Sequence, residues 1–212
     1  MKSRQTQEQL IVFSRYPEPG TTKTRLARAL GDQGAAEMQK KLTEYTVLQV
    51  RLFLQLSPVE AIISYDGGSL EQIQKWLGHD FKYQAQGKGG LGQRMAKAFG
   101  AAFKKTYKRV VIIGTDCPGL HARHMAQAFE SLRHKDLVLG PATDGGYYLI
   151  GLRHFEQSLF KEIPWGTETV LTKTLNIAAQ KGLSLEILEK LSDVDRPEDL
   201  KHFNHHTDTQ RG

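Results

Sequence analysis

The sequence contains one cysteine, Cys117, in 212 residues. With a single cysteine, the chain can form neither an internal disulfide nor a cysteine-based zinc cluster. The absence of disulfides is usual for proteins of a reducing compartment. No apolar run reaches the roughly 20 residues that a membrane-spanning helix needs. Residues 1–9 are polar and lack the apolar core of a secretory signal. These absences predict a cytoplasmic protein with no membrane partner.

The chain carries a net charge of +6, but its basic residues are not interleaved with aromatic ones. The densest basic patch, residues 104–109, closes a predicted helix, where cations also interact favourably with the helix dipole. Proteins that bind single-stranded nucleic acid stack the bases on aromatic side chains. The sequence therefore predicts no nucleic-acid partner and leaves small anions as candidates.

Short apolar runs alternate with amphipathic segments, and no linker divides the chain. This alternation predicts an α/β sandwich of three layers, with a mostly parallel central sheet covered on both faces. We expect a flexible segment over residues 1–9, one domain over 10–201 and a polar tail over 202–212. The expected strands cover residues 10–14, 59–65, 81–84, 109–114, 136–141, 147–152 and 183–188. The expected helices cover residues 38–56, 69–77 and 91–103, a segment after the Asp116 loop that ends at about 133, a segment after Glu168 that ends at about 181, and a last segment that starts at Pro197.

An acidic residue follows the most strongly apolar strand, where Arg109–Gly114 gives way to Thr115 and Asp116. Open α/β sheets bind ligands outside the carboxyl ends of their strands. A second acidic segment, Asp193–Asp199, contains Asp195. Mg²⁺ or Mn²⁺ commonly takes one or two carboxylates plus substrate phosphates, so Asp116 and Asp195 are candidate metal ligands. The structural alternatives are a turn that begins at Asp116 and a helix cap at Asp195.

The first predicted strand leads into a loop with Gly20, Thr22, Lys23 and Arg25. Backbone N–H groups before a helix, together with two cations, favour binding of nucleotide phosphates. The loop is not a Walker motif, because Arg15 stands where the first glycine is required. A plain turn with solvated cations is the alternative.

The segment from Gln86 to Arg94 matches the G-x-G-x-x-G pattern with Gly87, Gly89 and Gly92. The strand before it is polar, which disfavours a dinucleotide fold of the usual kind. We expect a nucleotide base or ribose to approach this backbone, with Gln86, Gly87, Gly92 and Arg94 as binding residues. A plain glycine-rich loop is the alternative.

A third loop joins two predicted strands through Asp144, Gly145 and Gly146 to Tyr147. Asp144 can accept a hydrogen bond from a substrate hydroxyl or act as a base, while the glycines permit close approach. Trp165 and Thr167 are candidates for the wall of an acceptor pocket. An unliganded hairpin and a helix cap by Thr167 are the structural alternatives.

Taken in order, these motifs resemble the nucleotide-diphospho-sugar transferase superfamily of GT-A-type fold. The resemblance is strongest to a bacterial family of glycosyltransferases associated with arsenosugar biosynthesis. It is more distant to the guanylyltransferases of phospholactate and molybdenum-cofactor synthesis. The similarity spans residues 10–200, and its matching stretches are Phe13–Pro17, Pro19–Leu26, Gln86–Gly87, Leu91–Met95, Gly114–Pro118, Gly140–Tyr148 and Asp193–Leu200.

The resemblance implies a Rossmann-like GT-A-type sandwich that holds a nucleotide with the first loop and the 86–95 segment. It also implies Mg²⁺ or Mn²⁺ at Asp116, with Asp195 as a second ligand. This sequence has Arg196 where such transferases often carry threonine, and Asp193 is therefore a second candidate for that position.

The motifs and the resemblance lead to one expected function and two alternatives. The expected activity is metal-dependent transfer of a glycosyl group from a nucleotide-sugar donor to a small-molecule acceptor, with Lys23, Asp116 and Asp144 as catalytic residues. The first alternative is nucleotidyl transfer from a nucleoside triphosphate to a phosphorylated acceptor, with release of pyrophosphate. The second is a noncatalytic nucleotide-binding module. The base, the sugar, the acceptor and the oligomeric state are not determined by the sequence.

Overall fold

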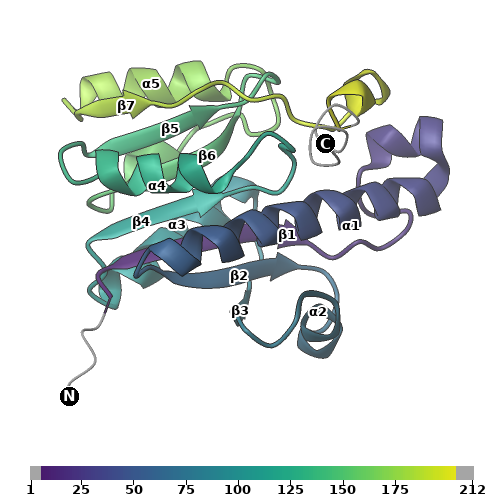
Figure 1. Ribbon diagram of the computed structural model, residues 1–212. Coiled ribbons are helices and arrows are strands. Elements are labelled where there is room, and N and C mark those ends of the chain that lie inside the picture. Colours follow the sequence, from purple (N-terminus) through teal and green to yellow (C-terminus); the bar gives the residue numbers. More distant parts are fainter. Residues whose placement is uncertain (1–5, 204–212) are drawn as a thin grey trace.

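The computed structural model describes residues 6–203 and consists of one sheet with helices on both faces (Figure 1). Residues 1–5 of the expected flexible segment and residues 204–212 of the expected tail lie outside the described residues. The strands are β1 (Glu8–Arg15), β2 (Glu60–Asp66), β3 (Lys82–Ala85), β4 (Arg109–Ile113), β5 (Leu137–Pro141), β6 (Tyr147–Leu152) and β7 (Leu185–Ile187). The helices are α1 (Thr24–Leu56), α2 (Leu70–Leu77), α3 (Leu91–Lys104), α4 (Ala122–Ser131) and α5 (Val170–Gln180), with short 3₁₀ turns η1 (Gln157–Phe160) and η2 (Pro197–Asp199).

The sheet has seven strands in the order β3-β2-β1-β4-β6-β5-β7. Strand β6 is antiparallel to both of its neighbours, β4 and β5, and the other described pairs are parallel. The predicted α/β class with a mostly parallel central sheet is thus confirmed. Because β6 runs in the opposite direction, its first residues lie at the same edge as the last residues of β1, β2 and β4.

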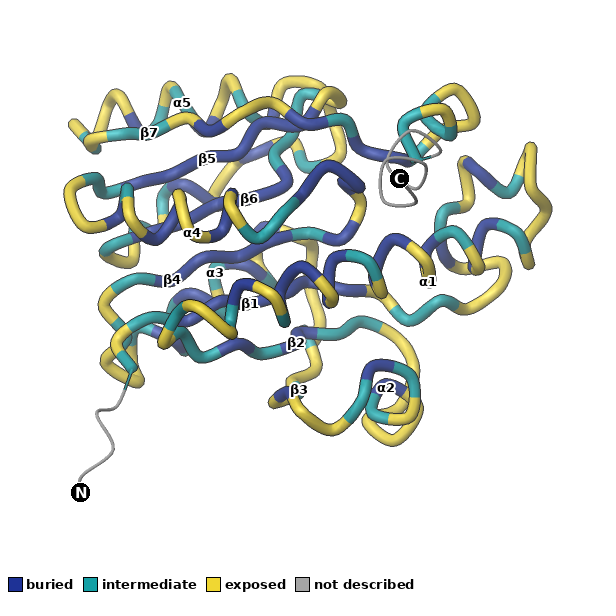
Figure 2. The backbone as a smooth tube through the Cα atoms, viewed as in Figure 1, coloured by how far each residue is buried: buried dark blue, intermediate teal, exposed yellow. Residues whose placement is uncertain are grey.

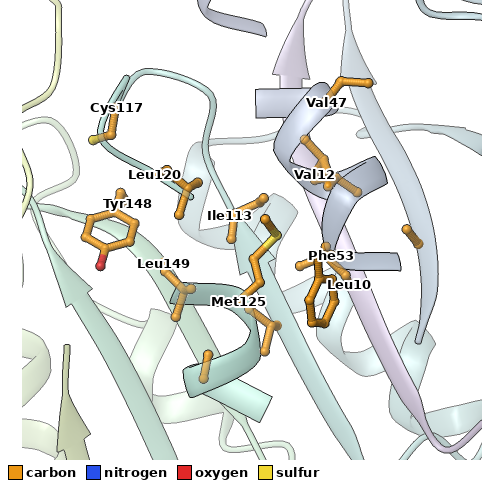
Figure 3. Packing of buried hydrophobic residues seen from close by; sticks show 14 of the residues in the cluster. Leu10, Val12, Val47, Phe53, Ile113, Cys117, Leu120, Met125, Tyr148 and Leu149 are labelled. Atoms are coloured by element: carbon orange, nitrogen blue, oxygen red, sulfur yellow. The ribbon is translucent and has the colours of Figure 1, made fainter. Parts of the chain in front are cut away.

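The two faces of the sheet are covered by different helices. Alternate residues of a strand point to opposite faces, and in β1 Leu10 and Val12 pack with α1, α2 and α4, whereas Ile11 and Phe13 pack with α3. Figure 2 shows the central strands as the most continuously buried part of the chain. Figure 3 shows Val47 and Phe53 of α1 packing over strand residues on the first of these faces. This burial on both faces explains why the central strands have almost uninterrupted apolar sequences.

Helix α1 begins earlier than the amphipathic pattern predicts, at Thr24 instead of residue 38. The helix is interrupted at Gly31, whose φ of 69° is left-handed and readily adopted by glycine. Its first turns form a small separate core in which Leu26, Ala35 and Leu42 surround Val194. This packing brings the loop before α1 next to the segment that carries Asp195.

Strand β1 begins at Glu8, so Glu8 and Gln9 belong to the sheet and not to a flexible segment. Gln9 is buried, and its amide donates a hydrogen bond to Glu60 on β2. These residues are polar, so the apolar pattern of the sequence did not include them in the predicted strand.

At the other end of the described chain, Pro197 begins a 3₁₀ turn, as its fixed φ allows. None of the helices in residues 6–203 combines the length and apolarity required to cross a membrane.

Candidate active site

A cleft of about 580 Å³ lies at the edge of the sheet where β1, β2 and β4 end and β6 begins. This is the edge at which open α/β sheets bind their ligands. The cleft brings together most of the residues that the sequence singled out. Those that line it are Lys23, Arg25, Gln86, Arg94, Asp116, Asp144, Gly146, Tyr147, Trp165, Thr167, Asp193 and Asp195.

Lys23 joins the two predicted metal-binding positions. Its ammonium nitrogen lies 2.5 Å from a carboxylate oxygen of Asp116 and 3.8 Å from one of Asp195. It also donates a hydrogen bond of 2.7 Å to the carbonyl of Val194. The Lys23 side chain is only 4% exposed, and its backbone has a left-handed φ of 49°. Such backbone strain in a non-glycine residue persists only where the surroundings enforce it.

Asp195 reaches this position because the preceding residue is anchored. Val194 is fully buried against α1, and its backbone N–H donates a hydrogen bond of 2.9 Å to the carbonyl of Asp116. Residues remote in sequence are thereby held side by side at one rim. Arg25 adds a second cation there, with its guanidinium 2.7 Å from Asp195.

A buried polar network supports the Asp116 loop from below. The hydroxyl of Thr115 accepts hydrogen bonds from Gln39 and Thr43 of α1, each at 3.4 Å. All three residues are buried. Buried polar side chains are usually hydrogen-bonded, and here the bonds tie the loop after β4 to α1.

The other basic side chains of the cleft converge on Asp66, a residue that the sequence analysis did not select. Arg15 and Arg94 each lie 2.9 Å from the same oxygen of Asp66. Burial alone raises the pKa of Asp66, but the hydrogen bonds from Arg94 and Arg15 outweigh it and hold the pKa below its usual value. Asp66 is the last residue of β2, and Asp116 lies just after β4. The strand-end argument that selected Asp116 would therefore also have selected Asp66.

Gln86 lies beside this cluster and has a structural role. Its amide nitrogen donates hydrogen bonds to the carbonyls of Ser14 and Ser64, and its oxygen accepts one from Arg94. Gln86 therefore connects β1, β2 and α3 at the base of the cleft.

Several glycines and one threonine that were predicted to bind ligands do not line the cleft. Gly92 faces Trp165 instead, since a Cβ on Gly92 would lie 2.2 Å from the indole nitrogen. Gly145 packs against the backbone of Glu168 with a φ of 87°. The hydroxyl of Thr22 donates to the carbonyl of Glu18 in the loop. Gly20 and Gly87 also have left-handed φ values and shape turns.

The cleft also carries two carboxylates, Asp144 and Asp193, that are not paired with a cation among the described residues. Asp144 accepts a hydrogen bond of 2.8 Å from the backbone N–H of Gly146, which fixes the turn before β6. Asp193 accepts one of 3.0 Å from the hydroxyl of Thr143. Burial and the nearby charge of Asp144 raise the pKa of Asp193 above its usual value. These two acids are close enough to influence each other across the cleft floor.

Two aromatic rings also line the cleft. The rings of Tyr147 and Trp165 meet edge to face with centroids 6.1 Å apart. The hydroxyl of Tyr147 is buried, so the ring and not the hydroxyl is available to the cleft. Thr167 donates its hydrogen to the carbonyl of Pro164, and the residue that precedes α5 is Thr169, so Thr167 is not the helix cap considered as the structural alternative.

The acidic residues at the rim fit a divalent ion only in part. Asp116 and Asp195 supply hard oxygen donors that both contact the same ammonium. Among residues 6–203, no set of three acidic, histidine or cysteine side chains is arranged to hold a metal ion. Because Mg²⁺ and Mn²⁺ often bind through one or two carboxylates and substrate phosphates, the pair is sufficient if a nucleotide completes the coordination.

Known structures share this fold. A candidate nucleotide-diphospho-sugar transferase from Desulfovibrio desulfuricans G20 is 34% identical, with a TM-score of 0.83 over 92% of this chain and 85% of that one. Glucosyl-3-phosphoglycerate synthase from Mycobacterium tuberculosis, solved with Mn²⁺ and UDP, is 11% identical with a TM-score of 0.57 over 99% and 81% of the two chains. The inositol-1-phosphate CTP transferase from T. maritima is 13% identical with a TM-score of 0.53 over 98% and 97%.

The protein is therefore an enzyme of the transferase class, with the fold of the nucleotide-diphospho-sugar transferase superfamily. A family model described as "Uncharacterized protein conserved in bacteria (DUF2064)" matches residues 49–167. The chain belongs to this family. No curated protein matches it. The predicted superfamily is confirmed, whereas the roles of individual site residues stay predictions.

Proposed function

We propose that this protein is a metal-dependent glycosyltransferase that moves a sugar from a nucleotide-diphosphate donor to a hydroxyl of a small molecule. The observation that carries the proposal is the contact of Lys23 with both Asp116 and Asp195 at the sheet edge. A buried cation and two carboxylates at one rim form a site suited to a diphosphate and a divalent ion.

In this proposal the donor diphosphate lies at the loop before α1. Lys23 and Arg25 contact its oxygens, and the negative charge that grows on the leaving diphosphate is stabilised by their fixed positive charges. The nucleoside lies toward the cluster of Arg15, Asp66 and Arg94, next to Gln86. The polar side chains there offer both donors and acceptors to a base or ribose.

Asp116 and Asp195, with Asp193 as a substitute for the latter, would hold Mg²⁺ or Mn²⁺, which supplies a Lewis acid for the diphosphate when bound. The structure of the M. tuberculosis synthase contains Mn²⁺ together with UDP, and this supports a divalent ion beside the donor here. Lys23 must then turn from the carboxylates toward the phosphates. Its contacts with Asp116 and Asp195 are ionic and can be exchanged for contacts with the donor.

The acceptor binds beside Asp144, which is the candidate base. The acceptor oxygen forms a bond to the anomeric carbon while the bond from that carbon to the diphosphate breaks. The hydroxyl proton passes to Asp144, and the nucleoside diphosphate leaves with the electron pair. Tyr147 and Trp165 orient the acceptor, with Thr167 and the Gly145–Gly146 turn shaping the wall around it.

Nucleotidyl transfer is the second candidate function. The T. maritima CTP transferase shares the fold, and the cationic pair Lys23 and Arg25 would also suit a triphosphate. In that reaction a phosphate of the acceptor attacks the α-phosphorus, and pyrophosphate leaves.

A product assay separates these functions. The protein is incubated with nucleotide sugars or nucleoside triphosphates, with Mg²⁺ or Mn²⁺, and with a panel of acceptors. Release of nucleoside diphosphate that depends on an acceptor supports glycosyl transfer, whereas release of pyrophosphate supports nucleotidyl transfer. Tight nucleotide binding without turnover of any donor would instead indicate a noncatalytic module.

A further inference from the structure

The cleft is divided by charge. We use the name acceptor wall for Asp144, Tyr147, Trp165, Thr167 and Asp193. Of the described residues that line the cleft from residue 142 onward, none is lysine, arginine or histidine. The basic residues that line it all come from earlier in the chain and are Arg15, Lys23, Arg25 and Arg94.

The carboxylates on the two sides differ in how they are compensated. On the basic side, Asp66, Asp116 and Asp195 are all within ion-pair distance of a lysine or arginine. On the acceptor wall, Asp144 and Asp193 form no ion pair within residues 6–203, and their hydrogen-bond donors are the neutral Gly146 N–H and Thr143 hydroxyl. The acceptor wall therefore carries two carboxylates with no cation of residues 6–203 within ion-pair distance of them, although Lys23 bonds the carbonyl of Val194 beside Asp193.

The same wall presents aromatic surface. The rings of Tyr147 and Trp165 meet edge to face, and the indole packs against Gly92 at the start of α3. Aromatic faces attract cations through the ring quadrupole, most strongly for tryptophan. A phosphate or carboxylate at this wall would face two carboxylates in a partly desolvated cleft, where like charges repel strongly.

We propose that the acceptor is a hydroxyl compound that carries an amine or another cationic group and no phosphate or carboxylate. This inference rests on the proposed transfer reaction, with Asp195 and not Asp193 as the second metal ligand, and specifies its second substrate. The cationic group lies between the carboxylates of Asp144 and Asp193 and the rings of Tyr147 and Trp165, and the hydroxyl is directed to the donor. An acceptor of this kind also excludes the phosphorylated acceptor that the nucleotidyl alternative requires.

Three phenols of similar size that differ in the charge of their side group test the inference by binding. Tyramine, 2-(4-hydroxyphenyl)ethanol and 4-hydroxyphenylacetate share a phenol ring and carry a positive, neutral and negative group. Trp76 and Trp165 are the two tryptophans of the chain, so Trp76→Phe leaves Trp165 as the reporter of its own surroundings. We expect tyramine to change Trp165 fluorescence saturably and to bind at least about tenfold more tightly than the anion, with the neutral probe between them.

Matched variants locate the effect. In the Trp76→Phe background, Asp144→Asn and Asp193→Asn should each reduce the preference for tyramine, whereas Glu130→Gln on the exposed face of α4 should not. Equal or tighter binding of the anion would overturn the inference, as would the absence of a saturable signal from tyramine. A preference that survives both aspartate substitutions would overturn it as well.

Calorimetry with nucleoside diphosphates and Mn²⁺ on the same proteins keeps the two proposals separate. Failure of the proposed function appears as absence of nucleotide binding or of transfer. Failure of the acceptor inference appears as normal nucleotide binding without a preference for the amine.

Discussion

The carboxylates of the cleft fall into two groups that differ in how their charge is compensated. On the paired side, Asp66, Asp116 and Asp195 each form an ion pair with arginine or lysine, and the pKa of Asp66 lies below its usual value. On the unpaired side, which is the acceptor wall, Asp193 has a raised pKa because of burial and the neighbouring Asp144.

This contrast teaches that the two sides are prepared for different ligands. The lysine and arginine side chains of the paired side can exchange their bonds to aspartate for bonds to phosphate oxygens, so each cation keeps an anionic partner. The unpaired side can gain only from a neutral or positive group. A cleft with one side of each kind suits a reaction between an anionic donor and a non-anionic acceptor.

The largest expected effect comes from removing the carboxylate at the rim of the paired side. Asp116→Asn should lower turnover by about 100-fold or more, because the divalent ion that stabilises the leaving diphosphate loses a charged ligand. The measurement is kcat for donor cleavage with acceptor present. Glu130→Gln, which removes an exposed carboxylate of α4, should leave kcat unchanged. Wild-type turnover in Asp116→Asn would contradict the proposed role.

Packing between the two sides is tested by Gly92→Ala. The added Cβ would collide with Trp165, so we expect the free energy of unfolding to fall by about 1 to 3 kcal/mol and the acceptor wall to shift. Chemical denaturation measures the first effect and Trp165 fluorescence the second. Gly90→Ala is the control, because a Cβ there meets nothing within 4 Å and φ is −70°. Equal destabilisation by both variants would show that the contact with Trp165 does not decide the outcome.

Removing the buried cation of the paired side tests where phosphate binds. Lys23→Ala should weaken nucleotide binding by about tenfold, the cost of one lost charged hydrogen bond. Isothermal calorimetry with a nucleoside diphosphate measures this change. Lys104→Ala, on the last turn of α3, serves as the control. If both variants bind nucleotide with equal affinity, Lys23 has no part in binding it.

The smallest and most direct comparison pairs Asp66→Asn with Asp193→Asn. The pKa of Asp66 is lowered in the folded protein, so its charged carboxylate stabilises the fold at pH values above its usual pKa of 3.8. This stabilisation is lost as the pH falls through the pKa of the folded state. The pKa of Asp193 is raised in the folded protein, so its ionisation destabilises the fold. This loss of stability develops as the pH rises from 3.8 through the pKa of the folded state and is complete above that pKa.

At pH 7 the two substitutions should therefore act in opposite directions, each by about 1 kcal/mol. Asp66→Asn should destabilise and Asp193→Asn should stabilise, as measured by urea unfolding at several pH values. Both differences should shrink in acid as the carboxyls become protonated. Shifts of the same sign at pH 7 would remove the electrostatic distinction between the two sides.

The alternation of apolar strands and amphipathic helices was sufficient to predict the fold class. The predicted helix over residues 69–77 is present as α2, and Ser69 forms a capping box with Gln72 at its start. The first turns of α1 were missed because their apolar positions face Val194, a contact partner that no local pattern contains. The start of β1 was missed for a related reason, since Gln9 is satisfied by a residue of the neighbouring strand.

The candidate site shows the same division. Residue types at strand ends identified Asp116, Asp195 and Lys23 as members of one site. The sequence suggested that Gly92 contacts a nucleotide, but the structure gives it a packing role against Trp165. Asp66 was overlooked because its importance comes from two arginines, Arg15 and Arg94, that converge on it from other elements.

The sequence by itself determined the order of strands and helices and the kinds of chemistry available, because backbone preference and hydrophobic periodicity act between near neighbours. Only the tertiary structure decided which acids are neutralised. Asp195 meets Lys23 because Val194 is buried against α1, while Asp144 and Asp193 line the same cleft without forming an ion pair among the described residues. Charge compensation depends on distances across the fold, and those distances are set by packing.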